Sequence, residues 1–590
     1  MAALARAARG EAVLSLLRGR LQTPLAAPVA TAALLSLARC SRERAWAADA
    51  RVQALLTASA AATFEPSDAA RCVWALAKLG VTPQWLSTLL SAATPEALQS
   101  RELSLLVFGL GSLRARPPST AWLAALWASL SSTLPSCTPK DVGMLAYGLG
   151  AWAVRPPASL AAAFELESTK LLSACTPCEL AHCLYAFTAW AGDAPTERWL
   201  RLFWARVIAE LPAFKPRELA NVLHSSAVLG APLQPSTLDA LEAVTSERMS
   251  EFGARELSST LWSFARLSRV PTEDWLDAWA AESRRKMPTF KVNELSISLW
   301  ALAHLCHRPS DAWLAAFTAA SLPQLMDATP QALANMAWAF AVLDAPPPPA
   351  WMDAFAVRAL ASLDGFTRQG LALCCWALVV LQAYRCAALQ AVWERLLRKV
   401  DEERASMPSG DAVADEHELA RLERFQIDLR TVHEVHMLAG AEAPGLLSSP
   451  PAELLSMART TWLNETGAQA SAVRNSSRTF LEVATCLRSS LGLEPSELVL
   501  CRASDRIIDL ALERGALRLA LQVDGPSRFL RNTWQPSGAT RLRDRALAAA
   551  GWRVLSLPFY TLDELRTSEP RAEYLLRRLA DVEGSQTPSV

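Results

Sequence analysis

Arginines gather near the C-terminus of a chain whose overall charge is balanced. The chain has 590 residues, with 58 Lys and Arg against 58 Asp and Glu. Between Arg514 and Arg553, however, eight arginines stand against only two acids, Asp524 and Asp544. A guanidinium donates two parallel hydrogen bonds to phosphate oxygens, so this segment predicts a local phosphate-binding patch whose affinity falls as salt rises. The candidate phosphate ligands are Arg528, Arg531, Arg541, Arg543 and Arg545.

Cysteine and histidine occur in two arrangements that invite comparison with metal sites. The CxxC at Cys175–Cys178 is followed by His182 and Cys183, but zinc sites need a second ligand pair at a defined spacing, and none follows. The HEVH sequence at 433–436 differs from the HExxH that brings two histidines to one metal. We therefore predict no metal and no cofactor, with cysteines that stay reduced thiols.

A short sequence phrase recurs over residues 64–400. The CxxC lies within this repeated region, whereas the HEVH sequence and the C-terminal arginines lie after it. An acidic residue is followed by Leu, by an aromatic residue at plus six, and by small residues at plus seven and plus nine, as in Glu256-LSSTLWSFARL. The successive spacings are 34, 39, 38, 39, 38, 38, 38 and 38 residues. The copies begin at Asp68, Glu102, Asp141, Glu179, Glu218, Glu256, Glu294, Ala332 and Gly370. The plus-six residues are Trp74, Phe108, Tyr147, Tyr185, His224, Trp262, Trp300, Trp338 and Trp376.

Each copy predicts a helical hairpin. Its apolar positions recur at about 3.6 residues, and Thr138, Thr176 and Thr329 stand where N-cap residues belong. A second helix follows a Pro-containing turn and is marked by Trp85, Trp122, Trp199, Trp275, Trp313 or Trp351. One hairpin cannot bury its apolar face alone, so the chain predicts a mainly α fold, a right-handed α-solenoid of about nine hairpins. We expect the plus-six aromatic residues to pack in its core rather than to stack on bases.

A polar row runs along the first helix of each repeat, at minus one and plus three. Amides, hydroxyls and guanidinium groups bind the edges of unpaired bases, so we predict that this row faces single-stranded RNA; an ordinary solvated helix surface is the alternative. The repeats at Glu102 and Asp141 carry Leu105 and Met144 at plus three and are not expected to read a base. The row consists of Arg71, His182, Arg217, Asn221, Arg255, Ser259, Asn293, Gln331, Asn335 and Gln369.

The repeat resembles the octotricopeptide repeat and is similar to the repeats of FAST-kinase-like organellar proteins. The copies Glu218-LANVLHSSAVLG and Ala332-LANMAWAFAVLD carry the resemblance best. It implies sequence-selective binding of organellar transcripts, with roughly one nucleotide for each repeat. It implies no phosphoryl transfer, because the chain lacks a Gly-rich phosphate loop.

The first 45 residues are typical of a transit peptide for a mitochondrion or chloroplast. They are rich in Arg, and Glu11 is the only acid before Glu43. A capping helix for the array is the alternative. The longest apolar run, Leu371 to Leu381, is too short to span a bilayer, so we expect a protein of the matrix or stroma rather than the membrane. The arginines of the first forty residues are Arg6, Arg9, Arg18, Arg20 and Arg39.

Beyond the array at 50–400, we expect a linker region with a short helix at 401–455 and an α/β region at 456–590. Strands are predicted from about Leu498, at 506–512, 517–525 and 552–559, with a helix at 539–551 before the last. The phrases at 523–530 and 541–560, with the closing Tyr574-LLRRL, resemble the RAP domain over about 520–579.

The RAP domain is similar in layout to restriction-endonuclease-like folds, in which acids on neighbouring strands hold a divalent cation. The resemblance makes Asp509 and Asp524 the candidate catalytic acids. Gln522 stands where related sequences carry Glu, and an amide is a poorer ligand for a hard cation. No Lys follows it, because Gly525 and Pro526 make a turn. These departures favour a domain that is not an enzyme.

The sequence therefore predicts an organellar RNA-binding factor for the processing, stability or translation of specific transcripts. Its partner would be single-stranded mRNA or rRNA precursor, within a ribonucleoprotein complex. Two alternatives stay open: a metal-dependent RNA endonuclease in the RAP domain, and a protein-interaction scaffold, since stacked hairpins also bind peptides.

Overall fold

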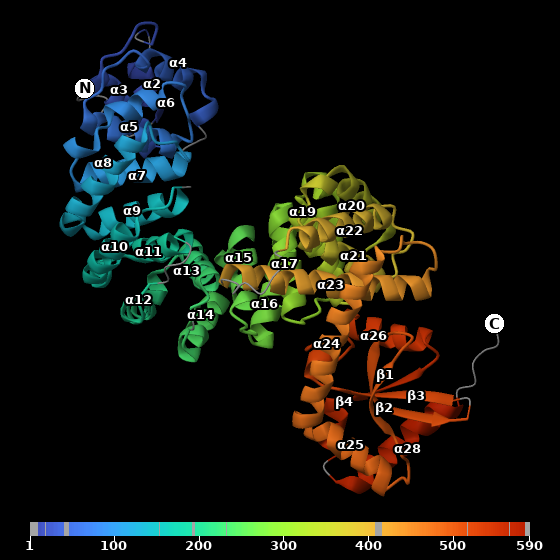
Figure 1. The fold of residues 1–590 in the computed structure, drawn as a ribbon. Helices are drawn as coiled ribbons and strands as arrows, with labels where there is room; N and C mark the ends of the chain where they lie inside the picture. The colour runs from blue at the N-terminus through green and yellow to red at the C-terminus, as the bar shows by residue number, and fades with distance from the viewer. Residues whose placement is uncertain are drawn as a thin grey trace. The chain divides into compact units, whose positions relative to one another are not determined.

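The structure, a computed structural model, describes residues 10–17, 19, 21–40, 46–152, 154–190, 195–231, 233–407, 416–515, 517–565 and 567–584. Arg6, Arg9, Arg18 and Arg20 of the expected transit peptide lie outside these residues. Contacts divide the chain into two compact units, Met1–Phe252 with Pro271–Ala278, and Gly253–Val270 with Trp279–Val590. Helices dominate both units, and the second also holds a four-stranded sheet (Figure 1). Among the described helices, none has the length and apolarity that a membrane span requires.

Hairpins of two helices build the first unit. Its first helices each pack against the next along the chain (Figure 1). They are α3 (Ala27–Arg39), α5 (Pro66–Leu79), α7 (Ser100–Leu113), α9 (Pro139–Ala151), α11 (Pro177–Ala189) and α13 (Pro216–Leu229). The short α2 (Gly10–Leu16) precedes them. The second helices are α4 (Ala50–Ser59), α6 (Leu86–Ala92), α8 (Thr120–Thr133), α10 (Ala158–Leu171), α12 (Glu197–Glu210) and α14 (Pro235–Glu247). Since α3 packs on α5 as a first helix, residues 27–39 belong to the folded array.

The second unit continues the same pattern. Its first helices, again packed in succession, are α15 (Ala254–Arg266), α17 (Val292–His304), α19 (Pro330–Val342) and α21 (Arg368–Val380). Its second helices are α18 (Asp311–Ser321), α20 (Pro349–Ala361) and α22 (Leu389–Ala405), while α16 (Glu273–Lys286) has residues in both units. The segment expected as a short helix is the 27-residue α23 (Glu416–Glu442), which packs on α21 and α22. The helix α22 extends into the expected linker, and 408–415 lie outside the described residues.

In the repeats that begin at Asp141, Glu179, Glu218, Glu256 and Glu294, the acidic residue that opens the phrase caps its own helix. The Glu179 carboxylate accepts the backbone N–H of Thr176 at 2.8 Å, and this N-cap bond recurs at Glu218, Glu256 and Glu294. Such a bond satisfies a helix N-terminal N–H that has no partner within the helix. Where Ala332 replaces the acid, the Thr329 hydroxyl accepts the Ala332 N–H at 3.2 Å. In these repeats the first residues of the phrase therefore fix where the first helix begins.

Glycines at plus seven and plus nine let α7 and α9 approach closely. A Cβ built on Gly111 would lie 2.1 Å from the Gly148 carbonyl oxygen, and one on Gly148 would lie 2.4 Å from the Val107 oxygen. Neither distance is possible for a real side chain. The small residues at plus seven and plus nine thus bring the first helices of this pair close together.

Tryptophans join successive second helices. The Trp313 indole N–H donates to the Ser283 hydroxyl at 2.9 Å, and the Trp351 N–H donates to Ser321 at 2.9 Å. Each hydroxyl lies at the end of the preceding second helix, and both indoles are 1% exposed. Equivalent bonds run from Trp199 to Ser168 and from Trp275 to Thr245. The repeats are thus linked along a second row as well as through their first helices.

The C-terminal α/β region has the predicted element order. The strands are β1 (Ser496–Cys501), β2 (Arg506–Arg514), β3 (Leu517–Asp524) and β4 (Arg553–Pro558), in the spatial order β1-β2-β3-β4. The first three are antiparallel, and β4 runs parallel to β3 with Ser556 opposite Gln522. The helices are α24 (Ala452–Ser476), α25 (Arg478–Ser489), α26 (Gly538–Ala549), α27 (Phe559–Glu564) and α28 (Ser568–Gly584). Leucines of β2, β3 and β4 pack with α25, α27 and α28 in one core.

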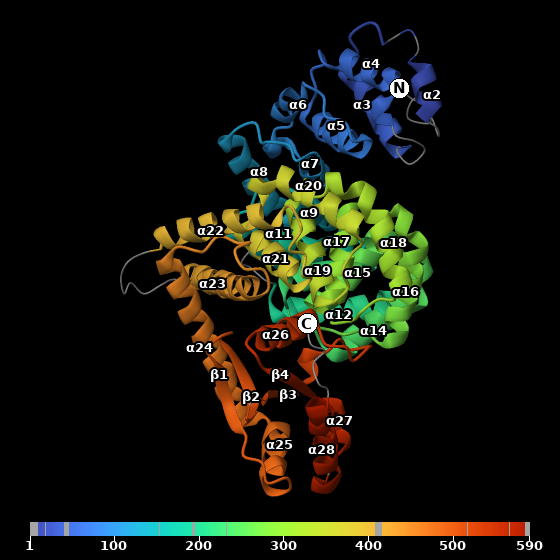
Figure 2. The ribbon, with the colours of Figure 1, turned by 90° about the vertical axis from the view of Figure 1, so that its right-hand side faces the viewer.

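Helix α26 attaches this region to the repeats of the second unit, and Figure 2 shows it between the sheet and the repeat helices. Arg545 donates to the carbonyl oxygens of Val380 at 2.6 Å and Val379 at 2.8 Å, which end α21. Its Nε donates to Glu442 at 2.9 Å. A Cβ on Gly538 would lie 1.8 Å from the Ala341 oxygen, so only glycine permits this approach to α19.

Candidate nucleic-acid interface

The minus-one and plus-three residues of the predicted polar row lie on the same face of each first helix. Gln331 Nε2 donates to Asn335 Oδ1 at 2.8 Å, which joins minus one to plus three directly. The minus-one residues of the row are exposed and its plus-three residues are partly exposed. Asn221 makes no side-chain hydrogen bond with any residue that the structure describes. The row therefore presents amides to solvent in the middle and later repeats.

Two members of the row are engaged by neighbouring repeats. Arg71 forms an ion pair with Glu102 of the next first helix, with 3.2 Å between Nη2 and Oε1. The His182 ring lies against Tyr147, with 5.0 Å between ring centroids. Burial lowers the pKa of His182 to about 4, so its imidazole is neutral at physiological pH. These contacts link repeats and limit what either side chain offers to a base.

The plus-six aromatic residues border the polar row instead of filling the core. All nine are partly exposed, whereas the plus-one, plus-five and plus-eight residues of α15, Leu257, Leu261 and Phe264, are fully buried. The expectation that the plus-six side chains are core residues is wrong, because the interface between first helices is already filled by those positions. Neighbouring copies instead contact one another, as Phe108 does with Tyr147 at 5.0 Å and Trp300 with Trp338 at 6.3 Å between centroids.

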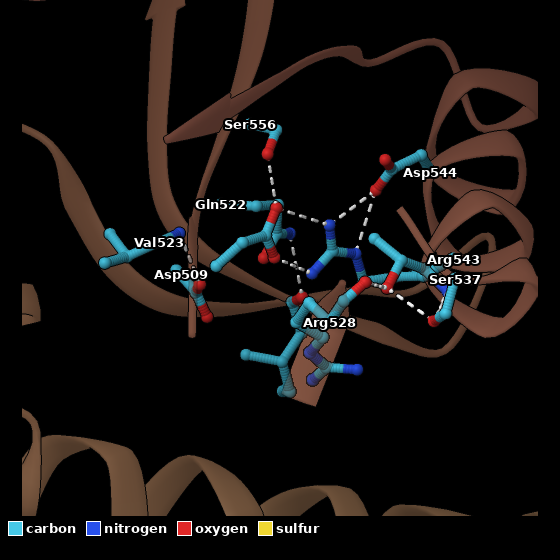
Figure 3. Close-up of polar contacts among 11 residues, drawn as sticks. Asp509, Gln522, Val523, Arg528, Ser537, Arg543, Asp544 and Ser556 are labelled. Atoms are coloured by element: carbon cyan, nitrogen blue, oxygen red, sulfur yellow. Dashed lines mark hydrogen bonds and ion pairs between the residues drawn. The ribbon is translucent and has the colours of Figure 1, made fainter. Parts of the chain in front are cut away.

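Most of the predicted phosphate-binding arginines are occupied within the protein. Arg543 is 8% exposed and pairs with Asp524 at 2.6 Å and Asp544 at 2.7 Å. Arg545 holds α21 as described above, and Arg541 pairs with Asp344 at 2.5 Å. Arg531 is exposed. Arg528 is exposed as well, and Figure 3 draws its guanidinium directed away from the Arg543 pairs.

The candidate nuclease acids lie on neighbouring strands but have different surroundings. The Asp509 carboxylate on β2 accepts the Val523 N–H at 2.9 Å, and burial raises the pKa of Asp509 to about 6. At the end of β3, both carboxylate oxygens of Asp524 accept hydrogen bonds from Arg543, and one also accepts the Ser556 hydroxyl at 2.5 Å. A guanidinium therefore holds the place beside Asp524 that a cation would need.

A pocket of about 310 Å³ opens over this part of the sheet. Asp509, Gln522, Arg528 and Arg543 line it from the α/β region, and Trp462 lines it from α24. The Gln522 amide donates to the Ile507 carbonyl oxygen at 3.3 Å, so β2 holds it in place. The sequence predicted the strands that carry these residues, but it gave no sign that α24 would cover them.

The cysteines next to His182 form two separate contacts, since Cys175 and Cys183 hydrogen-bond to each other while Cys178 contacts the His182 ring. Cys175 and Cys183 are buried, while Cys178 is exposed and lies 3.9 Å from the His182 Nε2 atom. All twelve cysteines of the chain are free thiols. The CxxC spans the start of a helix, since Cys178 follows Pro177, the first residue of α11.

Two family models match parts of this chain. Residues 196–383 match the N-terminal domain of the Tbc2 translation factor, and residues 521–578 match the RAP domain. A RAP domain-containing protein, chloroplastic, from Oryza sativa subsp. japonica is 42% identical over 62 residues, which is 10% of this chain and 10% of that protein. The human FAST kinase domain-containing protein 3, mitochondrial, is 34% identical over 62 residues, or 10% and 9% of the two chains. The matches span about a tenth of the length of these curated relatives.

The two matches correspond to the helical hairpins and to the C-terminal α/β region of the structure. The Tbc2 match covers the hairpins from α12 to α21, and the RAP match covers the segment from β3 to α28. The chain is thus an array of helical repeats that ends in a RAP domain.

Proposed function

We propose that this protein is an organellar RNA-binding factor that acts in the processing, stability or translation of specific transcripts. The observation that carries the proposal is the solvent-facing polar row of the first helices. Asn221 has its whole amide available, and the Gln331–Asn335 pair keeps one amide nitrogen and one carbonyl oxygen for a ligand. Amide groups of this kind bind the edges of unpaired bases.

The RAP match supports an organellar location, since both relatives bear organelle names, and we extend a matrix or stroma location to this chain. The repeats then bind single-stranded mRNA or rRNA precursor, and the protein acts by occupying a site within a ribonucleoprotein complex. Arg528 and Arg531 are the arginines of the RAP domain that supply phosphate contacts in this proposal.

Replacing the amides of the row tests the proposal. Crosslinking in the organelle and sequencing of the attached RNA identifies the cognate transcript, and fluorescence anisotropy then measures its affinity. We expect Asn221→Ala, Gln331→Ala and Asn335→Ala together to weaken cognate binding by about tenfold or more, since each hydrogen bond contributes about 1 kcal/mol. The melting temperature should stay unchanged, because these side chains are not part of the core.

Gln390→Ala is the matched control, because Gln390 is an exposed amide on the second helix α22. Equal affinity of the triple variant and the wild type would show that the row does not read bases. If the wild type shortens the RNA in the presence of magnesium and an Asp509→Ala, Asp524→Ala variant does not, the protein is a metal-dependent endonuclease and the proposal is wrong. If the wild type binds no RNA even at low salt, the alternative function, a protein-interaction scaffold, would be favoured instead.

A further inference from the structure

A groove of about 600 Å³ runs along the first helices of the N-terminal repeats, outside the segment that matches the Tbc2 domain. Side chains from α3, α5, α7, α9 and α11 line it, all within the first unit. Leu105 and Met144, the apolar residues at plus three, form part of the lining. These repeats therefore offer a ligand a continuous surface but few groups that distinguish one base from another.

The groove is strongly basic although the whole chain is neutral. Five cations line it, namely Arg39, Arg71, Lys78, Arg101 and Lys140, against the two acids Glu102 and Glu179. Both acids have other partners: Glu102 accepts from Arg71, and Glu179 caps α11. Arg39 and Lys140 are exposed and form no ion pair with any residue that the structure describes. Two positive charges in the groove are thus left for an anionic ligand.

An aromatic surface lies beside these charges. Trp74 of α5 is partly exposed in the groove, and its ring stacks on no aromatic ring among the described residues. Phe108 differs, because Lys78 Nζ lies 4.7 Å from its centroid and Tyr147 stacks on it at 5.0 Å. Trp74 therefore provides the open aromatic face, and the Lys78, Phe108 and Tyr147 stack provides a fixed wall beside it.

We propose that this groove holds single-stranded RNA without reading its sequence, with a base stacked on Trp74 and phosphates bound by Arg39 and Lys140. Aromatic faces beside a cationic track are how proteins bind single strands of any sequence, because every base has a π-face. An acidic peptide would satisfy the charges but would leave the indole face without a planar partner. The inference rests on the proposed function. It assigns different roles to two parts of the array: the N-terminal repeats hold RNA of any sequence, and the later repeats select the sequence.

The test measures affinity of the full chain for uridylate and adenylate homopolymers by fluorescence anisotropy. Trp74→Leu should weaken binding of both homopolymers about tenfold, as expected for loss of one stacked base, while Trp74→Phe retains most of the affinity. Arg39→Ala with Lys140→Ala should lower the slope of log affinity against log salt by about 1.4, since each phosphate contact to a single strand contributes about 0.7. All variants should weaken cognate and unrelated RNA by the same factor.

Trp204→Leu and Arg201→Ala are the matched controls, since both residues lie on the second helix α12 and outside the groove. Unchanged homopolymer affinity in Trp74→Leu would overturn this inference, as would a wild type that binds its cognate RNA but neither homopolymer. Competition by polyglutamate equal to that by RNA would overturn it too, in favour of an acidic protein partner. Failure of the wild type to bind any RNA, cognate included, would instead refute the proposed function.

Discussion

Burial holds the Asp509 carboxyl in an environment that disfavours its charge. Its pKa is raised to about 6, against a usual value of 3.8, because the cost of desolvation exceeds the help from the Val523 N–H and the nearby Arg543. The charged form is therefore strained in the native state at neutral pH.

The raised pKa predicts a pH-dependent effect of Asp509→Asn. Stability contributed by the protonated carboxyl is complete below about pH 4 and is lost as pH rises through about 6. The asparagine avoids this loss and still accepts the Val523 N–H. We expect Asp509→Asn to be more stable than the wild type by roughly 1–3 kcal/mol at pH 7.5, the upper limit being the pKa difference of about two converted to free energy.

Urea unfolding at pH 7.5 and at pH 4 checks this expectation. The advantage of Asp509→Asn should shrink toward zero at the lower pH. A variant less stable than the wild type at both values would mean that the carboxylate is stabilised by its surroundings.

The sequence shows that arginines cluster near the C-terminus, but it does not show which group each arginine binds. Arg543 and Arg545 were expected to bind phosphate, yet they bind Asp524 and Glu442, which lie 19 and 103 residues away along the chain. The composition of a basic segment does not distinguish an arginine that faces solvent from one that pairs at long range. Only the fold supplies the partner.

Hairpins of this protein are joined twice, once through their first helices and once through the tryptophans of their second helices. The sequence predicted the hairpins well, because an acid at N3 and a tryptophan after the turn act locally. It missed the hydroxyl that receives each indole, since Ser283 and Ser321 lie 30 residues before their tryptophans. It also missed the length of α23, whose mixed charged composition carries neither repeat phrase nor cap.

The indole bond predicts a specific loss of stability in Ser321→Ala. The variant leaves the buried Trp351 N–H without its partner, which costs about 1–3 kcal/mol. Chemical denaturation measures the loss. Ser362→Ala at the end of α20 is the control, because its hydroxyl bonds only within its own helix.

A double-mutant cycle with Trp351→Phe separates the bond from the packing of the ring. The cost of Ser321→Ala should largely vanish when the N–H is absent. An equal cost in both backgrounds would show that the serine contributes by shape and not by accepting the indole.

The RAP domain packs against the last repeats within the second unit. Arg545 joins α26 to α21 and α23 through two carbonyl oxygens and Glu442. Asn532 and Arg308 add a reciprocal pair of bonds, at 2.9 and 2.8 Å, near the end of α17. The sequence predicted both parts from their phrases, but no local signal indicates that they pack together.

Removal of the Arg545 side chain should loosen this attachment. We expect Arg545→Ala to cost about 1–3 kcal/mol, because Glu442 and two helix-end carbonyls lose a buried donor. Arg541→Ala, which removes a half-exposed ion pair with Asp344, should cost less than about 1 kcal/mol.

Hydrogen exchange of α26 and melting temperature measure both variants. Faster exchange confined to α26 and the end of α21 would support the attachment. Equal protection of α26 in Arg545→Ala and in the wild type would show that apolar packing alone holds the domain.

The attachment also bears on how such a protein changes its length over evolution. A hairpin duplicated ahead of α17 meets only its two neighbours, so the array can extend there. A hairpin inserted between α17 and α21 would shift Arg308 away from Asn532 while Val379 and Val380 stayed at Arg545. Descendants of this protein should therefore vary in repeat number near the N-terminus and keep the last three hairpins as a fixed set.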